Sequence, residues 1–309
     1  MRNEKVLLVD EVHASMAVGL GALGYEVVEH FDIPASEIPD ALSSFHGLII
    51  RSKMKLTAEV LAKAPSLRFI ARAGAGLDLI DLAYCEANNI AVFSANEGNK
   101  DAVAEHVMGQ LLVLAHKLNS ADTEVREGIW QREANRGWEI QGKTIGIIGY
   151  GNMGRALAQR LKGFEVKLLA YDKYRPADEF QASLDDIFQQ ADVVSLHIPL
   201  TEETRGMVNE SFIAHFHKPI VLLNSSRGPI SPLAPLLAGL QSGKIKGLAL
   251  DVLPNEKLAT WSTEEKDLFN AIKTFPATTF SPHVAGWTTE SYEKINLVLL
   301  EKIKAHFTR

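Results

Sequence analysis

The sequence has 309 residues, of which 46% are hydrophobic and 23% charged, an ordinary composition for a globular protein. A chain of this length is longer than a domain with one hydrophobic core usually is, which favours two domains. A formal net charge of −6 argues against nucleic acid or an anionic membrane surface as a partner, because both require a basic face.

The single cysteine, Cys85, excludes a disulfide within the chain and a cysteine-rich metal site, and no metal is expected. We expect Cys85 to be a small buried side chain rather than a reactive thiol. No apolar run approaches the ~20 residues that cross a bilayer. Residues 1–10 pass from a short polar lead directly into a strand-like run and lack the apolar centre of a signal peptide. The expected location is the cytoplasm.

Strand-like apolar runs alternate with helical segments, which predicts parallel sheets covered by helices on both faces. In the first third of the chain, the predicted strands are residues 5–10, 26–30, 47–52, 67–73 and 90–95. Thr57 is the expected N-cap of a helix over residues 57–64, because its hydroxyl can accept an unpaired amide proton. A long helix is predicted from Asp101 to Leu118, and its apolar stripe is Val103, Val107, Leu111 and Leu114.

After a polar segment, a second strand–helix series begins. Its predicted strands are residues 144–149, 166–172, 192–198, 220–226, 247–252 and 278–283, and a last helix follows over 290–307. The pattern predicts two doubly wound parallel-sheet domains. The second, residues 98–283, is inserted into the first, which is made of residues 1–97 and 284–309.

The stretch GYGNMG, residues 149–154, has the G-x-G-x-x-G pattern between a predicted strand and a predicted helix. In that context Gly149 permits a tight turn, Gly151 permits phosphates to approach the backbone, and Gly154 permits the helix to pack near the strand. We expect Asn152 and Met153, inside the turn, to contact a dinucleotide as well. A purely structural turn is the alternative.

An acidic residue about twenty positions further on would bind the adenosine ribose. Asp172 lies 18 residues past Gly154, at the end of the next strand. A carboxylate there would repel the extra phosphate of NADP, so NAD is the expected cofactor, although Lys173 and Arg175 lie nearby. Strand, helix and acid in register favour a Rossmann NAD-binding domain over a structural turn.

Three polar residues follow predicted strand ends, where open parallel sheets bind their ligands. They are Arg227, Glu256 and His283. Hydride transfer from an alcohol needs a base, and histidine titrates near neutral pH. A glutamate on the other ring nitrogen would fix the tautomer and favour imidazolium, and an arginine can hold a carboxylate through its planar fork. Taken singly, each is more often a structural or solvated residue.

At this point the sequence resembles the D-isomer-specific 2-hydroxyacid dehydrogenases. The segments that carry the resemblance are residues 72–82, 98–106, 149–164, 197–209, 224–228, 248–256 and 281–286. The resemblance implies a flavodoxin-like substrate domain with an inserted Rossmann domain, and a homodimer paired through the region of the 101–118 helix. It implies catalytic Arg227, Glu256 and His283.

The resemblance also implies further binding residues. Those expected at the cofactor are His197, Pro199, Thr204, Ser225 and Asp251, the last near the nicotinamide. Those expected at the substrate are Arg51, Ser52, Ala75, Gly76 and Asn99, of which Ala75 and Gly76 act through their backbone.

The sequence departs from the family pattern in two places. Residues 229–235, PISPLAP, replace an acidic stretch, which casts doubt on the capping of the following helix. Residues 257–280, which include Trp261, are longer than usual. A dimer contact or a neutral insertion is favoured there over a substrate lid.

Arg51 and Lys53 at a strand end would suit a substrate phosphate, which favours D-3-phosphoglycerate, oxidised to 3-phosphohydroxypyruvate in serine synthesis. The chain ends at Arg309, so we expect no serine feedback through a regulatory domain. Glyoxylate or hydroxypyruvate reduction is the alternative. D-lactate has less support, and formate dehydrogenases are known for an amide where Glu256 stands. A non-catalytic NAD-sensing protein remains an alternative from a different functional class.

Overall fold

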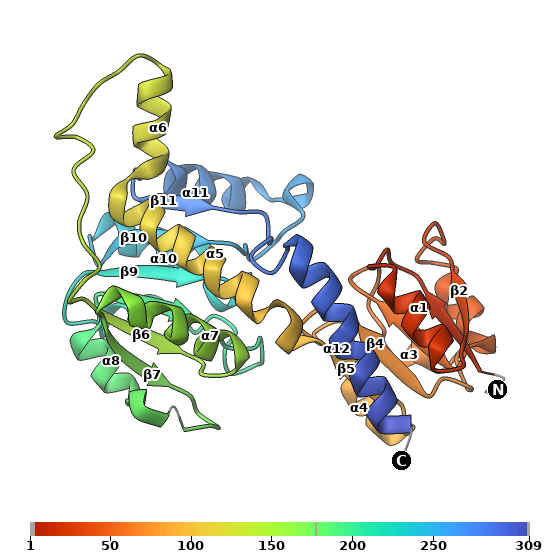
Figure 1. Ribbon diagram of the computed structural model, residues 1–309. Coiled ribbons are helices and arrows are strands. Elements are labelled where there is room, and N and C mark those ends of the chain that lie inside the picture. The colour runs from red at the N-terminus through yellow and green to blue at the C-terminus, as the bar shows by residue number, and fades with distance from the viewer. Residues whose placement is uncertain (1–3, 177, 308–309) are drawn as a thin grey trace. The chain divides into compact units, whose positions relative to one another are not determined.

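The computed structural model describes residues 4–176 and 178–307 (Figure 1). They form two compact units, residues 1–100 with 287–309 and residues 101–286. Each boundary lies three residues after the expected one. Within the described residues, no helix combines the length and apolar character that a membrane span requires.

The first unit is built on a five-stranded parallel sheet with the order β2-β1-β3-β4-β5. This is the flavodoxin-like order, and it confirms the expected fold and all five predicted strands. Its strands are β1 (Lys5–Leu8), β2 (Glu26–Glu29), β3 (Gly47–Ile50), β4 (Phe69–Arg72) and β5 (Ala91–Ser94). Its helices are α1 (Ser15–Ala22), α2 (Ile38–Ala41), α3 (Ala58–Leu61), α4 (Leu82–Ala87) and α12 (Thr289–Phe307), with a 3-10 turn η1 (Leu42–Ser44).

Helices cover both faces of this sheet. The last helix, α12, buries Ile295, Leu299 and Ile303 against α1 and one sheet face, which is the predicted return of the chain to its first domain. The Thr57 hydroxyl caps α3 by accepting from the amide of Val60, as expected. Cys85 is buried, and desolvation raises the pKa of its thiol to about 11, so it is an unreactive core residue.

The second unit is built on a six-stranded parallel sheet with the order β11-β10-β9-β8-β6-β7. Its strands are β6 (Thr144–Ile148), β7 (Lys167–Tyr171), β8 (Val193–Leu196), β9 (Ile220–Asn224), β10 (Ile245–Leu250) and β11 (Thr278–Phe280). Its helices are α6 (Leu118–Arg126), α7 (Asn152–Leu161), α8 (Leu184–Gln190), α9 (Glu210–Ala214), α10 (Leu233–Gln241) and α11 (Thr263–Lys273). Short 3-10 turns are η2 (Lys162–Phe164), η3 (Asp178–Phe180), η4 (Gly228–Ile230) and η5 (Leu258–Thr260).

Beyond β7, the described residues extend the sheet by a single parallel bridge between Ala170 and Gln181. If Gln181 is counted as the third strand of this unit, the order becomes that of a Rossmann fold, 3-2-1-4-5-6, with one added strand. The NAD-binding fold expected from the glycine pattern is therefore present, with its third strand reduced to a single residue.

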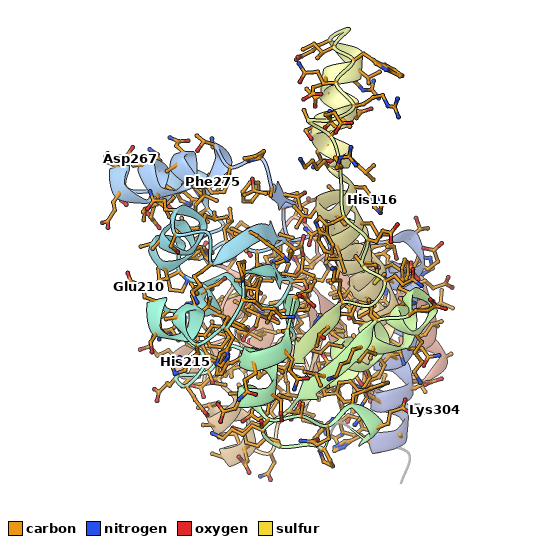
Figure 2. All side chains as sticks on the ribbon, turned by 90° about the vertical axis from the view of Figure 1, so that its left-hand side faces the viewer. His116, Glu210, His215, Asp267, Phe275 and Lys304 are labelled. Carbon is orange, nitrogen blue, oxygen red and sulfur yellow. The ribbon has the colours of Figure 1, made fainter. Side chains whose placement is uncertain are left out.

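Helix α5 (Asn96–His116) begins five residues before the expected start and ends two residues before the expected end, because the φ of 52° at Lys117 interrupts the helix. The predicted apolar stripe, Val103, Val107, Leu111 and Leu114, is buried in the core of the second unit. The stripe therefore offers no surface to a second subunit. The next helix, α6, contains no buried residue and extends away from the second sheet (Figures 1 and 2).

The departures from the family pattern have structural consequences inside the second unit. Helix α10 has Pro232 at its N-cap and no side-chain cap, which confirms the doubt about its capping. The long 257–280 segment forms α11 and β11, so it is part of the domain's framework. Trp261 is buried, donates its indole N–H to the Asn255 carbonyl at 2.7 Å and packs edge-on against Phe269.

Candidate active site and cofactor site

The glycine turn has the geometry that a dinucleotide requires. Gly149 has a φ of +95°, and a Cβ there would lie 2.5 Å from the His197 carbonyl oxygen. A Cβ at Gly154 would lie 2.2 Å from the Gly149 carbonyl oxygen, so α7 packs against the turn only because residue 154 is glycine. At Gly151 an added Cβ would meet nothing within 4 Å. The open space lies at the amino end of α7, where free amides favour a phosphate.

Asp172 lies beside this turn, at the carboxyl end of β7. Its Oδ2 accepts from the Tyr150 amide at 2.8 Å, and its Oδ1 accepts from the amides of Tyr174 and Arg175, both at 2.9 Å. These bonds fix the carboxylate next to the phosphate-binding turn. Oδ1 already accepts two bonds, whereas Oδ2 accepts one and keeps a lone pair that a ribose hydroxyl can use.

The other expected cofactor residues line the ends of β8 and β9. The Thr204 hydroxyl donates to the Pro199 carbonyl at 2.6 Å and holds the loop after β8. His197 Nε2 lies 2.8 Å from the Ser195 hydroxyl, and burial lowers the pKa of His197 to about 4, so its ring is neutral at pH 7. Among the described residues, the buried Ser225 hydroxyl has no hydrogen-bond partner. That hydroxyl and the open space at Gly151 fit a bound dinucleotide.

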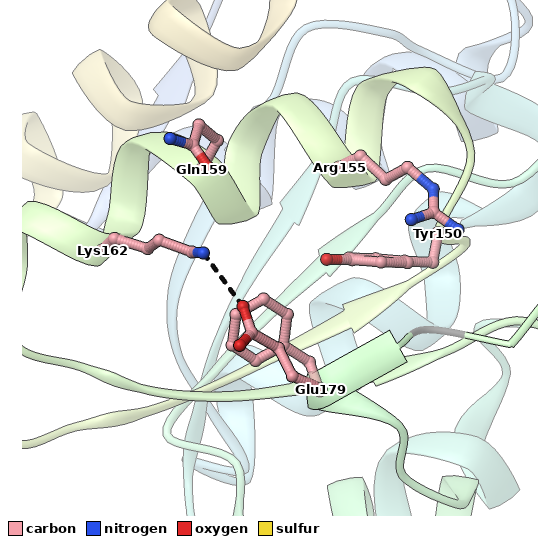
Figure 3. A pocket seen from close by; sticks show the side chains of 6 residues that line it. Tyr150, Arg155, Gln159, Lys162 and Glu179 are labelled. Carbon is pink, nitrogen blue, oxygen red and sulfur yellow. Dashed lines mark hydrogen bonds and ion pairs between the residues drawn. The ribbon is translucent and has the colours of Figure 1, made fainter.

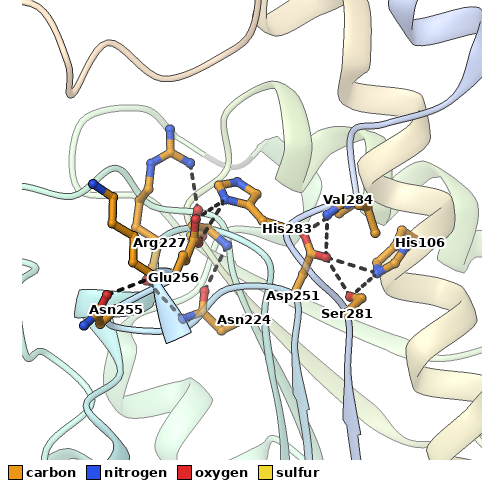
Figure 4. Close-up of polar contacts among 12 residues, drawn as sticks. His106, Asn224, Arg227, Asp251, Asn255, Glu256, Ser281, His283 and Val284 are labelled. Atoms are coloured by element: carbon orange, nitrogen blue, oxygen red, sulfur yellow. Dashed lines mark hydrogen bonds and ion pairs between the residues drawn. The ribbon is translucent and has the colours of Figure 1, made fainter. Parts of the chain in front are cut away.

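His283 and Glu256 form a hydrogen-bonded pair (Figure 4). The Nδ1 of His283 lies 2.9 Å from one carboxylate oxygen of Glu256 and 3.0 Å from the other. A carboxylate only accepts, so the proton lies on Nδ1, and Nε2 is the nitrogen that can exchange a proton with a substrate. Both side chains are about half exposed, which leaves the pair accessible.

Arg227 follows β9 and lies near this pair in Figure 4. Its Nη1 donates to the carbonyl of Ser226 at 2.7 Å. The backbone around it is held by Asn224, whose amide donates to the Arg227 carbonyl at 3.2 Å. The three residues predicted from separate strand ends therefore gather at one edge of the second sheet.

The backbone of His283 is in the left-handed region, with a φ of 55°. This conformation is unfavourable for a residue with a side chain, so surrounding bonds must hold it. Asp251, at the end of β10, holds it: its carbonyl accepts from the His283 amide at 2.7 Å. Its carboxylate accepts from the amides of Val284 at 2.9 Å and Ala285 at 3.0 Å.

Asp251 is only 2% exposed, so the structure gives it a role that the sequence did not predict. Its carboxylate is turned toward the loop that carries His283. The predicted contact of Asp251 with the nicotinamide end of the cofactor stays a prediction.

The expected substrate residues lie in the first unit, at the carboxyl ends of β3 and β4 and in α5. Asp10 Oδ2 accepts from the amides of Arg51, Ser52 and Lys53 at 2.6, 3.0 and 3.2 Å, and this shapes the loop after β3. The Lys53 ammonium donates to the carbonyls of Val9, at 2.9 Å, and Phe31. Lys53 therefore supports the loop with its charge.

Arg51 is oriented differently from Lys53. Its guanidinium lies 3.9 Å from the ring centroid of Trp287 and donates to the Glu11 carbonyl at 3.2 Å. Ala75 and Gly76 follow β4 and are partly buried. The buried Asn99 carbonyl oxygen has no partner among the described residues, so it can receive a donor from a ligand.

A cavity of about 390 Å³ beside α7 is lined by none of the predicted site residues (Figure 3). Its walls include Tyr150, Arg155 and the Lys162–Glu179 ion pair, at 2.9 Å. Arg155 lies over the Tyr150 ring at 4.6 Å. The charged side chains around this cavity interact with one another, so we assign the cavity no part in the reaction.

Sequence reasoning missed several residues that support the site: Asp10, His106, Ser281 and Trp287. Asp10 and Ser281 follow strands, as the predicted residues do, and this position was the available signal. The residues to which they hydrogen-bond are distant in the sequence. Asp10 and Arg51 are 41 residues apart, and Ser281 and His106 are 175 residues apart.

Comparison with known proteins identifies the chain. Residues 108–285, more than half of its length, match the family model of the NAD-binding domain of D-isomer specific 2-hydroxyacid dehydrogenases. The chain is 34% identical over 278 residues to a hydroxypyruvate reductase of Thermotoga maritima, covering 89% of this chain and 88% of that one. It is 31% identical over 304 residues to a D-3-phosphoglycerate dehydrogenase of Haemophilus influenzae, covering 96% and 73%.

Among solved structures, D-lactate dehydrogenase from Aquifex aeolicus, complexed with NAD and lactic acid, is similar with a TM-score of 0.83. The identity is 26%, over 99% of this chain and 97% of that chain. The turn, the fold and these relatives agree on NAD as the cofactor. The chain belongs to the D-isomer specific 2-hydroxyacid dehydrogenases.

Proposed function

We propose that this enzyme interconverts D-3-phosphoglycerate and 3-phosphohydroxypyruvate, the first step of serine synthesis. The proposal rests above all on the His283–Glu256 pair at 2.9 Å, which supplies an acid/base group at the sheet edge beside Arg227. The preference for a phosphorylated substrate rests on Arg51.

His283 is the proposed acid/base. With Nδ1–H directed at Glu256, the neutral ring accepts the proton of the substrate hydroxyl at Nε2. The imidazolium formed is stabilised by the carboxylate, and it returns the proton when a keto acid is reduced. The glycine turn and Asp172 would hold NAD, which when bound would supply the hydride chemistry. Arg227 holds the substrate carboxylate or carbonyl oxygen, as its planar fork allows.

Arg51 is the proposed phosphate ligand. The Trp287 face, 3.9 Å from its guanidinium carbon, restricts the long side chain without consuming all of its N–H donors. Such an ordered guanidinium binds a phosphate with little loss of side-chain entropy.

Hydroxypyruvate is the second candidate, and the Lys53 contacts favour it. Because the Lys53 ammonium bonds to two backbone carbonyls, only one of the two expected cations is left for a phosphate. An unphosphorylated three-carbon acid such as hydroxypyruvate does not need two cations for a phosphate. The similarity to a hydroxypyruvate reductase along nearly the whole of both chains points the same way.

Steady-state kinetics separates the candidates. We expect 3-phosphohydroxypyruvate to give a higher kcat/KM than hydroxypyruvate, glyoxylate or pyruvate, with NADH preferred over NADPH. Arg51→Gln should raise KM for the phosphorylated acid about 10- to 100-fold, which corresponds to one charge-assisted hydrogen bond, and leave hydroxypyruvate nearly unaffected. Arg51→Lys should recover part of the loss. An equal effect on both acids would refute phosphate binding by Arg51.

The catalytic assignment has its own test. His283→Ala should lower kcat by about 100-fold or more, the usual contribution of general acid–base catalysis, with NADH affinity unchanged. Fluorescence titration measures that affinity. Failure to turn over any 2-keto acid despite NADH binding by the unmodified chain would instead favour a non-catalytic NAD sensor.

We also propose a homodimer. The support is a set of exposed apolar side chains on α6 and the loop after it, namely Leu118, Val125, Ile129 and Trp130. Trp130 is 78% exposed, and such a surface is typical of a protein contact.

A further inference from the structure

We propose that His106 is a positioning residue for the proton transfer carried out by His283, acting through Ser281 and Asp251. The inference rests on the proposed catalytic role of His283. Of the residues involved, His106 and Ser281, both in the second unit, have no predicted part in the reaction.

The connection is a chain of short contacts (Figure 4). Nε2 of His106, on α5, lies 2.8 Å from the Ser281 hydroxyl, which donates to Asp251 Oδ1 at 2.6 Å. The same Oδ1 accepts from the Val284 amide at 2.9 Å. Residue 284 directly follows His283, so four contiguous groups connect a helix to the reactive imidazole.

Counting donors fixes the proton on His106. The Ser281 hydroxyl has one proton, and the 2.6 Å contact with a carboxylate oxygen, which only accepts, requires it. Ser281 also accepts from the Gln110 side-chain amide at 3.0 Å. The remaining contact, with His106, must therefore be a bond donated by Nε2–H of the imidazole.

The Gln110 orientation is fixed by the same count. If its carbonyl oxygen faced Ser281, that oxygen and Asp251 would compete for one hydroxyl proton. Either the Ser281–Asp251 contact or the Ser281–Gln110 contact would then bring two oxygens together with no proton between them. The hydrogen bonds therefore allow one arrangement of protons at Ser281. A hydroxyl with a fixed proton can hold the Asp251 carboxylate in one orientation.

Position matters here because His283 occupies a strained conformation. Its φ of 55° is maintained by the hydrogen bond that the His283 amide donates to the Asp251 carbonyl. Two further hydrogen bonds, from the amides of Val284 and Ala285 to the Asp251 carboxylate, hold the same loop. Asp251 is nearly fully buried, and its orientation depends on Ser281 and on the His106 imidazole, whose Nε2 lies 3.6 Å from Oδ1. Loss of the His106 donor would free Ser281 to rotate, and the loop of His283 would lose its alignment.

The test compares His106→Leu, which removes the donor, with His106→Gln, which retains an N–H donor. We expect His106→Leu to lower kcat about tenfold, as loss of one hydrogen bond to an ionic network implies, with KM and NADH affinity changed less than about twofold. The solvent deuterium isotope effect on kcat should rise, because a misplaced imidazole makes proton transfer slower. His106→Gln should recover most of kcat. His116→Leu, an exposed position on the same helix, is the matched control and should behave as wild type.

A mutant cycle with His283→Ala checks the route of the effect. In the His283→Ala background, His106→Leu should lower kcat no further, because the imidazole that His106 positions is absent. The inference is overturned if His106→Leu retains wild-type kcat and isotope effect. It is also overturned if kcat falls together with melting temperature and NADH affinity without recovery in His106→Gln. Full turnover by His283→Ala would overturn the proposed catalytic role itself, and this outcome is distinct from both.

Discussion

At the scale of single residues, burial and local hydrogen bonds decide which charges are available. His197 lies at the end of β8, where desolvation lowers the pKa of its imidazole to about 4 from 6.5. Between those two values the unfolded chain binds a proton at this residue and the folded chain does not. The free energy of unfolding contributed by His197 therefore falls as the pH drops from 6.5 to 4.

This shift predicts a measurable difference between His197→Asn and the unmodified chain. The unmodified chain should lose at most about 3 kcal/mol more stability between pH 7 and pH 4, because its charged imidazole is excluded from the folded state. Urea unfolding of the cofactor-free proteins at a series of pH values measures the difference. Parallel stability curves for the two proteins across this range would contradict the assigned burial.

Residue identity and position predicted the reacting side chains better than their surroundings. His283 and Glu256 could be inferred because their chemistry is recognisable after strand ends. The occupation of Lys53 by two carbonyls could not be inferred, because one of them, Phe31, lies 22 residues away in the chain. The proton on His106 depends on contacts with three other side chains, which only a folded structure supplies.

At the scale of elements, the packing of α7 onto the glycine turn is the feature most sensitive to a single methyl group. Gly154→Ala would place a Cβ 2.2 Å from the Gly149 carbonyl oxygen, and the helix must shift to relieve that contact. We expect a loss of about 1–3 kcal/mol in stability and a weakened NADH affinity, because the shift moves the phosphate-binding amides. Thermal melts and NADH titration measure the two effects.

Gly163→Ala is the control for this prediction. Gly163 lies in η2, close to the end of the same helix, and an added Cβ there meets nothing within 4 Å. It should leave NADH affinity unchanged. Equal behaviour of the two variants would show that the close approach at Gly154 does not position the cofactor site.

The elements themselves were largely predictable because buried parallel strands are continuous apolar runs. All eleven observed strands fall on predicted runs, with ends that differ by a few residues. The third Rossmann strand was not predicted, because a single bridge at Gln181 leaves no apolar run. The end of the predicted 101–118 helix lies within two residues of the observed end at His116, but the helix α6 that follows the left-handed Lys117 was not predicted.

At the scale of the whole molecule, an apolar stripe on a helix predicts burial without saying which partner covers it. The α5 stripe favoured a second subunit in that role, and in fact the chain's own second core covers it. The proposed subunit contact lies instead on α6 and the following loop, where apolar side chains are exposed within the described residues. A helix with no buried residue is marginal alone, which also favours a partner for α6.

Light scattering on the purified chain should therefore give twice the mass of 33.9 kDa at micromolar concentration. Trp130→Ser combined with Val125→Ser should shift the mass toward one chain, because two exposed apolar side chains, one of them a large aromatic, are lost from the proposed contact. Tyr174→Ser is the control, since Tyr174 is as exposed as Trp130 and lies outside this surface. A dimer that survives the double substitution would place the contact elsewhere, and a single-chain mass for the unmodified protein would remove it. Because α6 has no buried residue of its own, we expect the monomeric variant to exchange the α6 amides faster than the dimer does.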